Sequence, residues 1–306
     1  MSGSAVNKAL RGGRDTRTRA AHGRSHLGRR ILGVGIIVVI VVTVAALVTD
    51  TVAAMRTEHG FSRALLTSPG LTYEPEVTIS GFPFLTHARD GRFSGAVITA
   101  RGVSVACPPR DGCHAELGAT LGPMTVPDGF SIEPSDIVHT ESLSAYTRLD
   151  SVNLGRMLGI VDLTVNTPAP ADKAGGGGPG DGLLRRSTGV VLTGTVPLPS
   201  SSASTDVAPS ASTYDGPTVR VSVLVDLSVV DGRLHLEATD FYRGPERHAD
   251  AEVAEDLRDL VLSAFTATLP VLPLPWDLAP TEAHSEGSDV LLAGHVGPRD
   301  LRPDAF

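Results

Sequence analysis

One uncharged run, from Ile31 to Thr49, constrains this chain more than any other feature of its sequence. The run is 19 residues long and consists almost entirely of Ile, Val, Leu, Ala and Gly. About 20 apolar residues cross the hydrocarbon core of a bilayer as a helix, because each residue rises about 1.5 Å. A helix packed on a soluble core would show a polar stripe, and this run has none. We therefore predict one transmembrane helix at residues 31–49.

The charges on either side of the run predict its orientation. Residues 1–30 carry eight Lys or Arg residues and one acid, whereas Asp50 and Glu58 follow the run. Basic flanks stay on the cytoplasmic side. The sequence predicts a basic cytoplasmic tail at 1–30, a single-pass span in the plasma membrane and an extracytoplasmic domain at 50–306. A cleaved signal peptide is the alternative, but the run exceeds the about 7–15 residues of a signal core.

The charge balance excludes nucleic acid as a partner. The whole chain has a net charge of −8, so the residues after the basic tail together carry −15. Such a body would repel a phosphate backbone. The Arg-rich tail beside an apolar run is instead typical of a segment that sets topology and contacts anionic headgroups.

The chain has two cysteines, Cys107 and Cys113, which enclose a turn-rich loop. Two cysteines cannot build a four-thiolate zinc site. In an oxidising compartment this pair is expected to form a local disulfide that pins a hairpin tip. A redox dithiol is the alternative, although that chemistry usually has C-x-x-C spacing.

Alternation of apolar and polar residues predicts a body rich in β-strands. Strands are expected at 76–80, 93–105, 115–126, 159–166, 187–196, 219–230, 234–238 and 288–296, the last of which closes the chain. The pair Asp231-Gly232 favours a tight hairpin turn. Helices are expected at 50–66 and 250–269. Two low-complexity stretches, 167–182 and 199–213, are expected to be loops within one domain.

The signatures of catalysis are nearly absent from this sequence. It contains no G-x-S-x-G, no H-E-x-x-H, and no G-x-G-x-x-G after a strand. Apart from His22 and His26 in the basic tail, no two histidines stand at metal-ligand spacing. Ser131, Asp136 and His139 are neighbours, but proximity in a Pro-rich loop is poor support for a triad. We expect no enzyme activity, no metal and no cofactor, and an envelope hydrolase with an unrecognised site remains an alternative.

One segment carries a family resemblance. Residues 76–86, E-V-T-I-S-G-F-P-F-L-T, are followed by Gly91-Arg92-Phe93 and later by Gly102-Val103-Ser104-Val105. This order resembles the signature of the LmeA-like phospholipid-binding proteins of the actinobacterial cell envelope. The C-terminal part is also similar, with a helix, then Leu272-Pro273-Leu274-Pro275, then a strand that contains Gly294. The resemblance covers roughly residues 50–306.

The resemblance implies an α+β, strand-rich domain of the TULIP-like kind, in which a curved antiparallel sheet wraps long helices and leaves an apolar groove for acyl chains. It implies a membrane-anchored protein that binds or transfers phospholipid and supports envelope maintenance. Phospholipid and membrane are the expected partners, and the sequence names no protein partner. A non-catalytic scaffold for envelope enzymes, which would use the G-F-P-F edge for strand addition or docking, is the alternative.

The candidate lipid-binding residues are few. They are Phe82, Phe84 and Leu85 in the G-F-P-F-L segment, Arg92 in the following turn, and Trp276 after the Pro-rich stretch. The apolar residues could form a groove mouth or a membrane-facing edge, and ordinary core packing explains them equally well. Arg92, with Arg89 and Arg101, could meet a phosphate headgroup or pair with surface acids.

Overall fold

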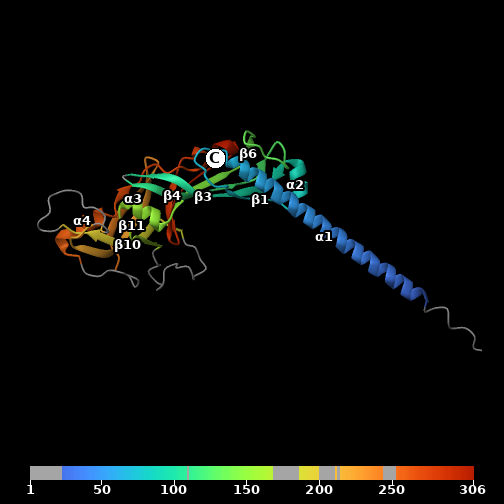
Figure 1. Ribbon diagram of the computed structural model, residues 1–306, viewed down its shortest axis with the longest axis horizontal. Helices are drawn as coiled ribbons and strands as arrows, with labels where there is room; N and C mark the ends of the chain where they lie inside the picture. Colours follow the sequence, from blue (N-terminus) through green and yellow to red (C-terminus); the bar gives the residue numbers. More distant parts are fainter. Residues whose placement is uncertain (1–22, 109, 168–185, 200–210, 212–213, 244–252) are drawn as a thin grey trace, which may run out of the picture. The chain divides into compact units, whose positions relative to one another are not determined.

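The computed structural model describes residues 23–108, 110–167, 186–199, 211, 214–243 and 253–306 (Figure 1). The chain forms two compact units, Met1–Thr51 and Val52–Phe306. Residues 1–22 of the basic tail, and nearly all of the predicted loops at 167–182 and 199–213, lie outside the described residues.

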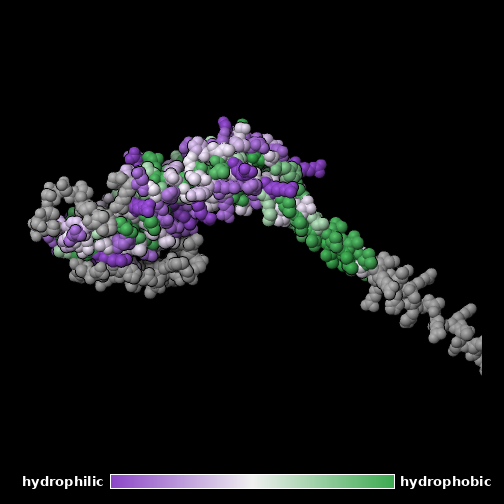
Figure 2. Space-filling view, viewed as in Figure 1, coloured by the Kyte–Doolittle hydropathy of each residue, from purple (hydrophilic) through white to green (hydrophobic). Residues whose placement is uncertain are grey.

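Helix α1 runs from Gly23 to Leu65. Its part from Leu32 onward is long and apolar enough to cross a membrane, and none of its most apolar window is buried within the protein. Figure 2 shows hydrophobic side chains covering this stretch, whereas the surface of the second unit is mixed. A signal sequence near an N-terminus passes the same test of length and composition. The helix ends before Pro69-Gly70, as predicted.

The largest sheet of the second unit is antiparallel and has the strand order β1-β3-β4-β7-β15-β14-β9. These strands are β1 (Glu76–Ser80), β3 (Gly95–Cys107), β4 (Arg110–Leu121), β7 (Leu143–Leu149), β15 (Asp289–Val296), β14 (Glu282–Glu286) and β9 (Arg186–Ser187). Along β7, the buried residues alternate with more exposed ones, so one face of the sheet turns to the core. A disulfide joins Cys107 to Cys113 across the β3–β4 hairpin, as predicted.

Two smaller antiparallel sheets complete the strand structure. The five-stranded sheet contains β13 (Ala267–Thr268), β12 (Arg233–Phe241), β11 (Thr218–Val230), β10 (Gly189–Pro197) and β8 (Thr164–Asn166), in that order. The four-stranded sheet contains β16 (Arg299–Leu301), β6 (Val138–Thr140), β5 (Met124–Thr125) and β2 (Arg92–Phe93). Strands β10 and β11 lie against β14, so the five-stranded sheet extends the core at that end of the large sheet.

Besides the last turns of α1, the α-helices described in the second unit are short: α2 (Phe84–Asp90), α3 (Ser151–Leu158) and α4 (Arg258–Ser263). The carboxylate of Asp150 caps α3 by accepting a 2.7 Å hydrogen bond from the Asn153 N–H. Glycines in the left-handed conformation end both α2 and α3, at Gly91 and Gly159. The fold is therefore α+β and strand-rich.

The G-F-P-F segment is a turn into a helix. Strand β1 ends at Ser80, the Phe82–Pro83 peptide bond is cis, and Pro83 is the N-cap of α2. Pro83 therefore lies beyond the end of the strand, where its missing N–H interrupts no ladder hydrogen bond. Strand addition at this segment, one of the two uses expected of a scaffold, is wrong because its chain leaves the sheet before Phe82.

The predicted helix at 250–269 is largely wrong. Residues 250–252 lie outside the described residues, and α4 covers only the middle of the range. The end of the range forms β13, in which Ala267 pairs with Leu236 and Thr268 with His235. The backbone of Ala267 and Thr268 pairs with the edge of β12. The spacing of apolar residues within 250–269 could not predict this pairing, because β12 lies elsewhere in the sequence.

Besides β13, four of the described strands escaped the sequence patterns: β6, β7, β14 and β16. β7 lies at the centre of the large sheet, and its apolar positions 143, 145 and 149 do alternate, so a period-2 scan could have found it. β14 carries His284 and Ser285 at buried positions, which hides its pattern. The expectation that 288–296 is the last strand is wrong, since β16 follows it and pairs with β6.

Replacing each of the two helix-ending glycines with alanine tests this backbone account. A Cβ at Gly159 would meet open space, whereas a Cβ at Gly91 would lie 2.7 Å from the carbonyl oxygen of Val126. We expect Gly159→Ala to lower the free energy of unfolding by about 1 kcal/mol, the cost of a left-handed alanine. Gly91→Ala should cost about 1–3 kcal/mol more, because the Val126 backbone must move.

Denaturant unfolding of the full chain in nanodiscs, followed by the emission of the single tryptophan, measures both variants. Equal losses at the two positions would contradict the close contact between Gly91 and Val126.

Candidate functional site

The structure brings four of the five predicted site residues together around α2 and places the fifth elsewhere. Phe82 is 74% exposed and Arg92 is also exposed, whereas Leu85 is half-buried. Phe84 is a core residue, with its ring stacked on Phe93 at 5.4 Å between centroids. Trp276 is buried against another part of the core.

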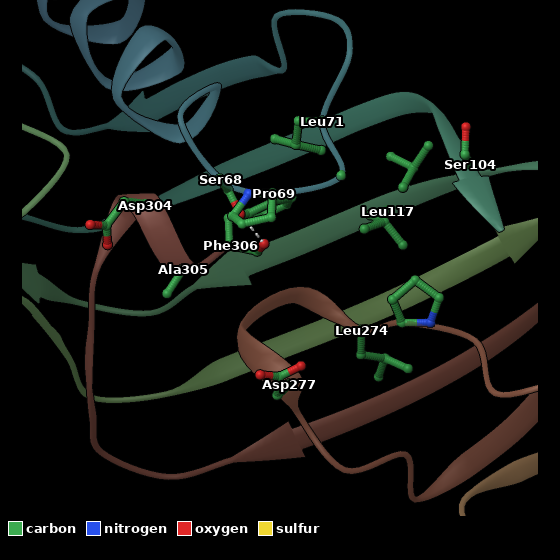
Figure 3. Close-up of a pocket in the computed structure, with 13 residues that line it drawn as sticks. Ser68, Pro69, Leu71, Ser104, Leu117, Leu274, Asp277, Asp304, Ala305 and Phe306 are labelled. Atoms are coloured by element: carbon green, nitrogen blue, oxygen red, sulfur yellow. Dashed lines mark hydrogen bonds between the residues drawn. The ribbon is translucent and has the colours of Figure 1, made fainter.

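A pocket of about 530 Å³ lies on the inner face of the large sheet (Figure 3). Three segments far apart in sequence meet over β3 and β4 to form it: the turn after α1, the Pro-rich stretch that follows residue 270, and the C-terminal residues. The described lining residues are Ser68, Pro69, Gly70, Leu71, Val103, Ser104, Leu117, Pro273, Leu274, Asp277, Asp304, Ala305 and Phe306. Its volume falls within the range of about 300–1,000 Å³ that is usual for ligand sites.

Hydrogen bonds hold the walls of this pocket in place. The Ser68 hydroxyl donates a 2.6 Å bond to the Phe306 carbonyl oxygen, which ties the turn after α1 to the C-terminal residues. The Thr147 hydroxyl donates to the carbonyl oxygen of Pro273, which fixes the Pro-rich stretch across β7. These bonds satisfy backbone carbonyls that no strand partner reaches.

Trp276 supports the pocket from behind its lining. Its ring meets that of Phe306 edge-to-face, with centroids 4.9 Å apart, and its Nε1 donates a 2.8 Å hydrogen bond to the carbonyl oxygen of Arg302. Trp276 and Asp277 have φ of 54° and 51°, in the left-handed region that few residues with a Cβ adopt. The contacts of the indole ring compensate for this backbone conformation.

The pocket combines an apolar interior with a polar rim. Val103, Leu117, Leu274 and Phe306 are buried apolar residues, and serine and aspartate contribute the polar atoms. No lysine, arginine or histidine is among the described lining residues. Such an interior binds hydrocarbon through burial of apolar surface, at about 0.8 kcal/mol per methylene group. Sequence reasoning missed this site because its lining residues come from segments that only tertiary packing joins.

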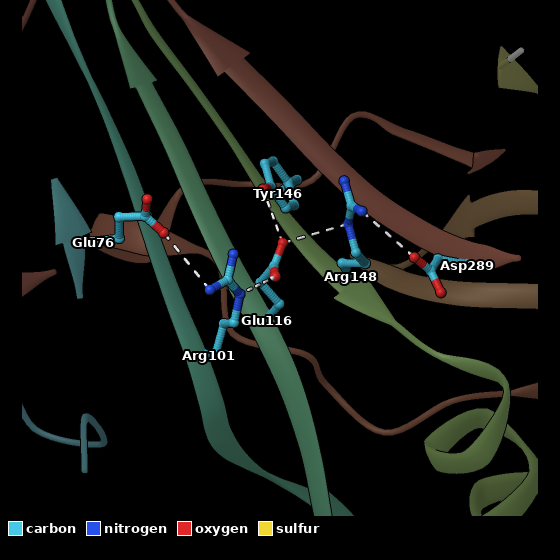
Figure 4. Close-up of polar contacts among 6 residues, drawn as sticks. All are labelled: Glu76, Arg101, Glu116, Tyr146, Arg148 and Asp289. Carbon is cyan, nitrogen blue, oxygen red and sulfur yellow. Dashed lines mark hydrogen bonds and ion pairs between the residues drawn. The ribbon is translucent and has the colours of Figure 1, made fainter. Parts of the chain in front are cut away.

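The opposite, outer face of the large sheet carries a row of alternating charges, here called the polar row (Figure 4). It comprises Glu76, Arg101, Glu116, Arg148 and Asp289, one from each of β1, β3, β4, β7 and β15. Arg101 approaches Glu76 and Glu116 at 3.6 and 3.3 Å, and Arg148 approaches Glu116 and Asp289 at 3.5 Å each. Each charge has an opposite neighbour, so the row joins strands and offers no unpaired acid or base. Arg101 is accordingly paired with acids.

Tyr146 lies within the polar row and packs over glycine. A Cβ at Gly118 would fall within 2.4 Å of three atoms of the Tyr146 side chain. The Tyr146 hydroxyl donates a 3.1 Å hydrogen bond to Glu116. Burial, followed by the negative charge of Glu116, raises the pKa of Tyr146. The phenol therefore stays a neutral donor in this row.

The hydrolase alternative gains no support from the described residues. The Ser131 hydroxyl donates to Glu133, and the Asp136 carboxylate accepts from the Glu133 N–H. His139 pairs with Asp300 at 2.7 Å and not with Asp136. Within the part of the chain that the structure describes, no cluster of three His, Cys, Asp or Glu residues could hold a metal ion.

The pH dependence of stability tests the environment of Asp289, the residue at the end of the polar row. Burial raises the pKa of Asp289; Arg148 opposes this rise, and the carboxylates of Asp150 and Glu116 add to it. A raised folded-state pKa means that the fold binds this proton more tightly than the unfolded chain does, so stability is lost as pH rises. Relative to Asp289→Asn, the wild-type chain should gain free energy of unfolding as pH falls from about 7 to 4.

Denaturant unfolding of both chains at several pH values in this range measures the difference. The pKa of Asp289 would not be raised if the difference in free energy of unfolding between the two chains stayed constant with pH. The same holds if Asp289→Asn became the more stable chain as pH falls.

The family model for LmeA-like phospholipid-binding proteins matches residues 48–295, a range that holds the G-F-P-F turn, most of the pocket lining and the polar row. Neither the curated proteins nor the solved structures yield a significant match. Because the family model covers well over half of the chain, this protein belongs to the LmeA-like phospholipid-binding family.

Proposed function

We propose that this protein is a membrane-anchored, extracytoplasmic protein that binds or transfers phospholipid and supports maintenance of the cell envelope. The observation that carries the proposal is the apolar pocket on the inner face of the large sheet, in a chain that belongs to a phospholipid-binding family. The pocket would hold acyl chain, and its polar rim would face the glycerol and headgroup.

The anchor is the apolar part of α1. Its length and exposed apolar surface suit a membrane span, and the Arg-rich tail would keep the N-terminus cytoplasmic. The disulfide between Cys107 and Cys113 suits an oxidising compartment outside the cytoplasm. Both features support a single-pass protein of the plasma membrane whose second unit is extracytoplasmic.

A TULIP-like arrangement is part of the proposal. The last turns of α1 bury Phe61 and Leu65 in the same apolar core as the large sheet. These turns would be the helix that the sheet wraps. The pocket then lies where the helix ends, at the turn of Ser68 to Leu71.

The proposed activity needs no catalytic group. The two carboxylates of the pocket rim, on Asp277 and Asp304, have no histidine beside them among the described lining residues, and Asp304 pairs with Arg302 at 2.5 Å. Holding and releasing an acyl chain requires apolar surface and an opening. The scaffold alternative differs in that it predicts no lipid in the pocket.

Photo-crosslinking with a phospholipid that carries a diazirine on its acyl chain tests the site. The full chain in proteoliposomes should crosslink in two places: along α1, which serves as an internal control, and at peptides that contain Leu71, Leu117 or Leu274. Leu71→Trp should lower the pocket crosslinks about tenfold, because the larger ring fills space that the acyl chain needs.

Leu260→Trp is the matched control, since Leu260 is an exposed leucine on α4 outside the pocket lining. It should leave both sets of crosslinks unchanged. Crosslinks confined to α1 in the wild-type chain would reject the pocket as a lipid site and favour the scaffold alternative.

A further inference from the structure

The phenylalanines of this chain divide sharply by position. All eight lie in described regions, and six are buried or half-buried: Phe61, Phe84, Phe93, Phe241, Phe265 and Phe306. Only Phe82 and Phe130 are exposed, at 74% and 49%. We call these two residues the aromatic tip. Two exposed rings in a chain that otherwise shelters its phenylalanines require an explanation beyond chance exposure.

The two rings stand on neighbouring segments. Phe82 precedes α2, and Phe130 lies on the loop that packs on α2, because Gly129 approaches the backbone of Ala88 so closely that a Cβ would lie 2.1 Å from its oxygen. The backbone of Phe130 is held on both sides: its N–H donates to Asp128 at 2.9 Å, and its carbonyl accepts from Thr57 at 3.2 Å. The tip is therefore a supported feature of the fold.

The backbone around Phe82 is equally well held. Phe84 is anchored in the core on Phe93, and a Cβ at Gly81 would meet the ring of His87 at 3.0 Å. His87 in turn bonds the carbonyl oxygen of Arg92 at 2.9 Å. With its neighbours fixed in this way, Phe82 presents its ring to solvent.

The tip lies where α1 joins the second unit. Thr57 bonds Phe130, and the carboxylate of Glu58 accepts a 2.8 Å hydrogen bond from the N–H of Ile79 in β1. Thr57 follows Thr49, where the apolar run ends, by eight residues of sequence. Met55, two residues nearer to the run, is exposed as well.

Exposed arginines near the tip suit an anionic lipid surface. Arg89 and Arg92 are exposed at the end of α2 and after it, with Asp90 between them, and Arg56 is exposed on α1. None of these three arginines forms an ion pair with a described residue. Two further acids lie near the tip, and each accepts a backbone hydrogen bond there: Asp128 from Phe130 and Glu58 from Ile79. Aromatic rings flanked by arginine are typical of protein surfaces that enter the headgroup region.

We infer that the aromatic tip inserts into the outer leaflet of the membrane in which α1 is anchored. Phe82 and Phe130 would enter the boundary between headgroups and acyl chains, and the nearby arginines would contact lipid phosphates. This inference rests on the proposed membrane anchor. It adds a second contact, through which the folded unit would reach the bilayer from which it draws lipid.

Single-cysteine labelling of the full chain tests the insertion. Both native cysteines are in the disulfide, so a maleimide carrying nitrobenzoxadiazole reports only on an introduced thiol. Phe82→Cys and Phe130→Cys place the probe at the tip, and Leu260→Cys places it on α4, at the other end of the second unit (Figure 1). Each labelled chain is reconstituted in vesicles of phosphatidylcholine and phosphatidylglycerol, with and without lipids that carry a doxyl quencher on the acyl chain.

The probes at residues 82 and 130 should lose at least about twice as much fluorescence to the lipid quencher as the probe at residue 260. Equal quenching at all three positions, together with equal quenching by aqueous iodide, would overturn the inference. Because all three positions are exposed, labelling does not disturb the core.

A pair of serine variants separates this inference from the proposed function. Phe82→Ser with Phe130→Ser should slow exchange of a fluorescent phospholipid between vesicles several-fold, and Leu260→Ser should leave the rate unchanged. An unchanged rate in the double variant would count against the tip. If the tip fails these tests while acyl-chain crosslinks persist in the pocket, the proposed function stands alone. If the probes at residues 82 and 130 are quenched by lipid but the acyl-chain crosslinker does not label the pocket, membrane insertion of the tip is supported and the pocket is rejected as a lipid site.

Discussion

The last turns of α1 and the turn that follows them hold together parts of the fold that are far apart in sequence. Their side chains bond the carbonyl oxygens of Phe130, Pro75 and Phe306, and Glu58 accepts from the N–H of Ile79. Phe61 and Leu65 fill the core between these polar contacts. Each hydrogen bond contributes about 1 kcal/mol and leaves a buried polar atom unsatisfied if it is lost. The edge strand β1, the loop that carries Phe130 and the C-terminal residues all depend on this one helix.

The aromatic tip and the pocket accordingly lie at the two ends of one short segment, residues 57–71. The tip is supported at Thr57, and the pocket is walled by the turn from Ser68 to Leu71. Between them the helix is buried in the core of the large sheet. The arrangement thus links the proposed membrane contact to the proposed lipid site through a shared support.

The structure also shows what the residues of the family motif do in the fold. Phe84 and Phe93 stack on each other in the core. Gly91 ends α2 in the left-handed conformation and lies so close to the backbone of Val126 that a side chain there would collide with it. Most of the motif therefore shapes the turn. Phe82 is its exposed apolar side chain, since core packing already employs the other rings. The motif alone could not separate these roles, because exposure is a property of the folded chain.

The sequence by itself determined the apolar helix, most strands of the body, the β11–β12 hairpin and the disulfide, because these follow from local periodicity, turn chemistry and cysteine spacing. It misjudged residues 250–269, where α4 covers only Arg258–Ser263 and the end of the range pairs with β12 as the short strand β13. Only the tertiary structure decided where the pocket lies and which phenylalanines are exposed. The pocket lining comes from the turn after α1, from β3 and β4, and from the last 34 residues. No local pattern records such a meeting, because it depends on how segments more than 30 residues apart pack on one sheet.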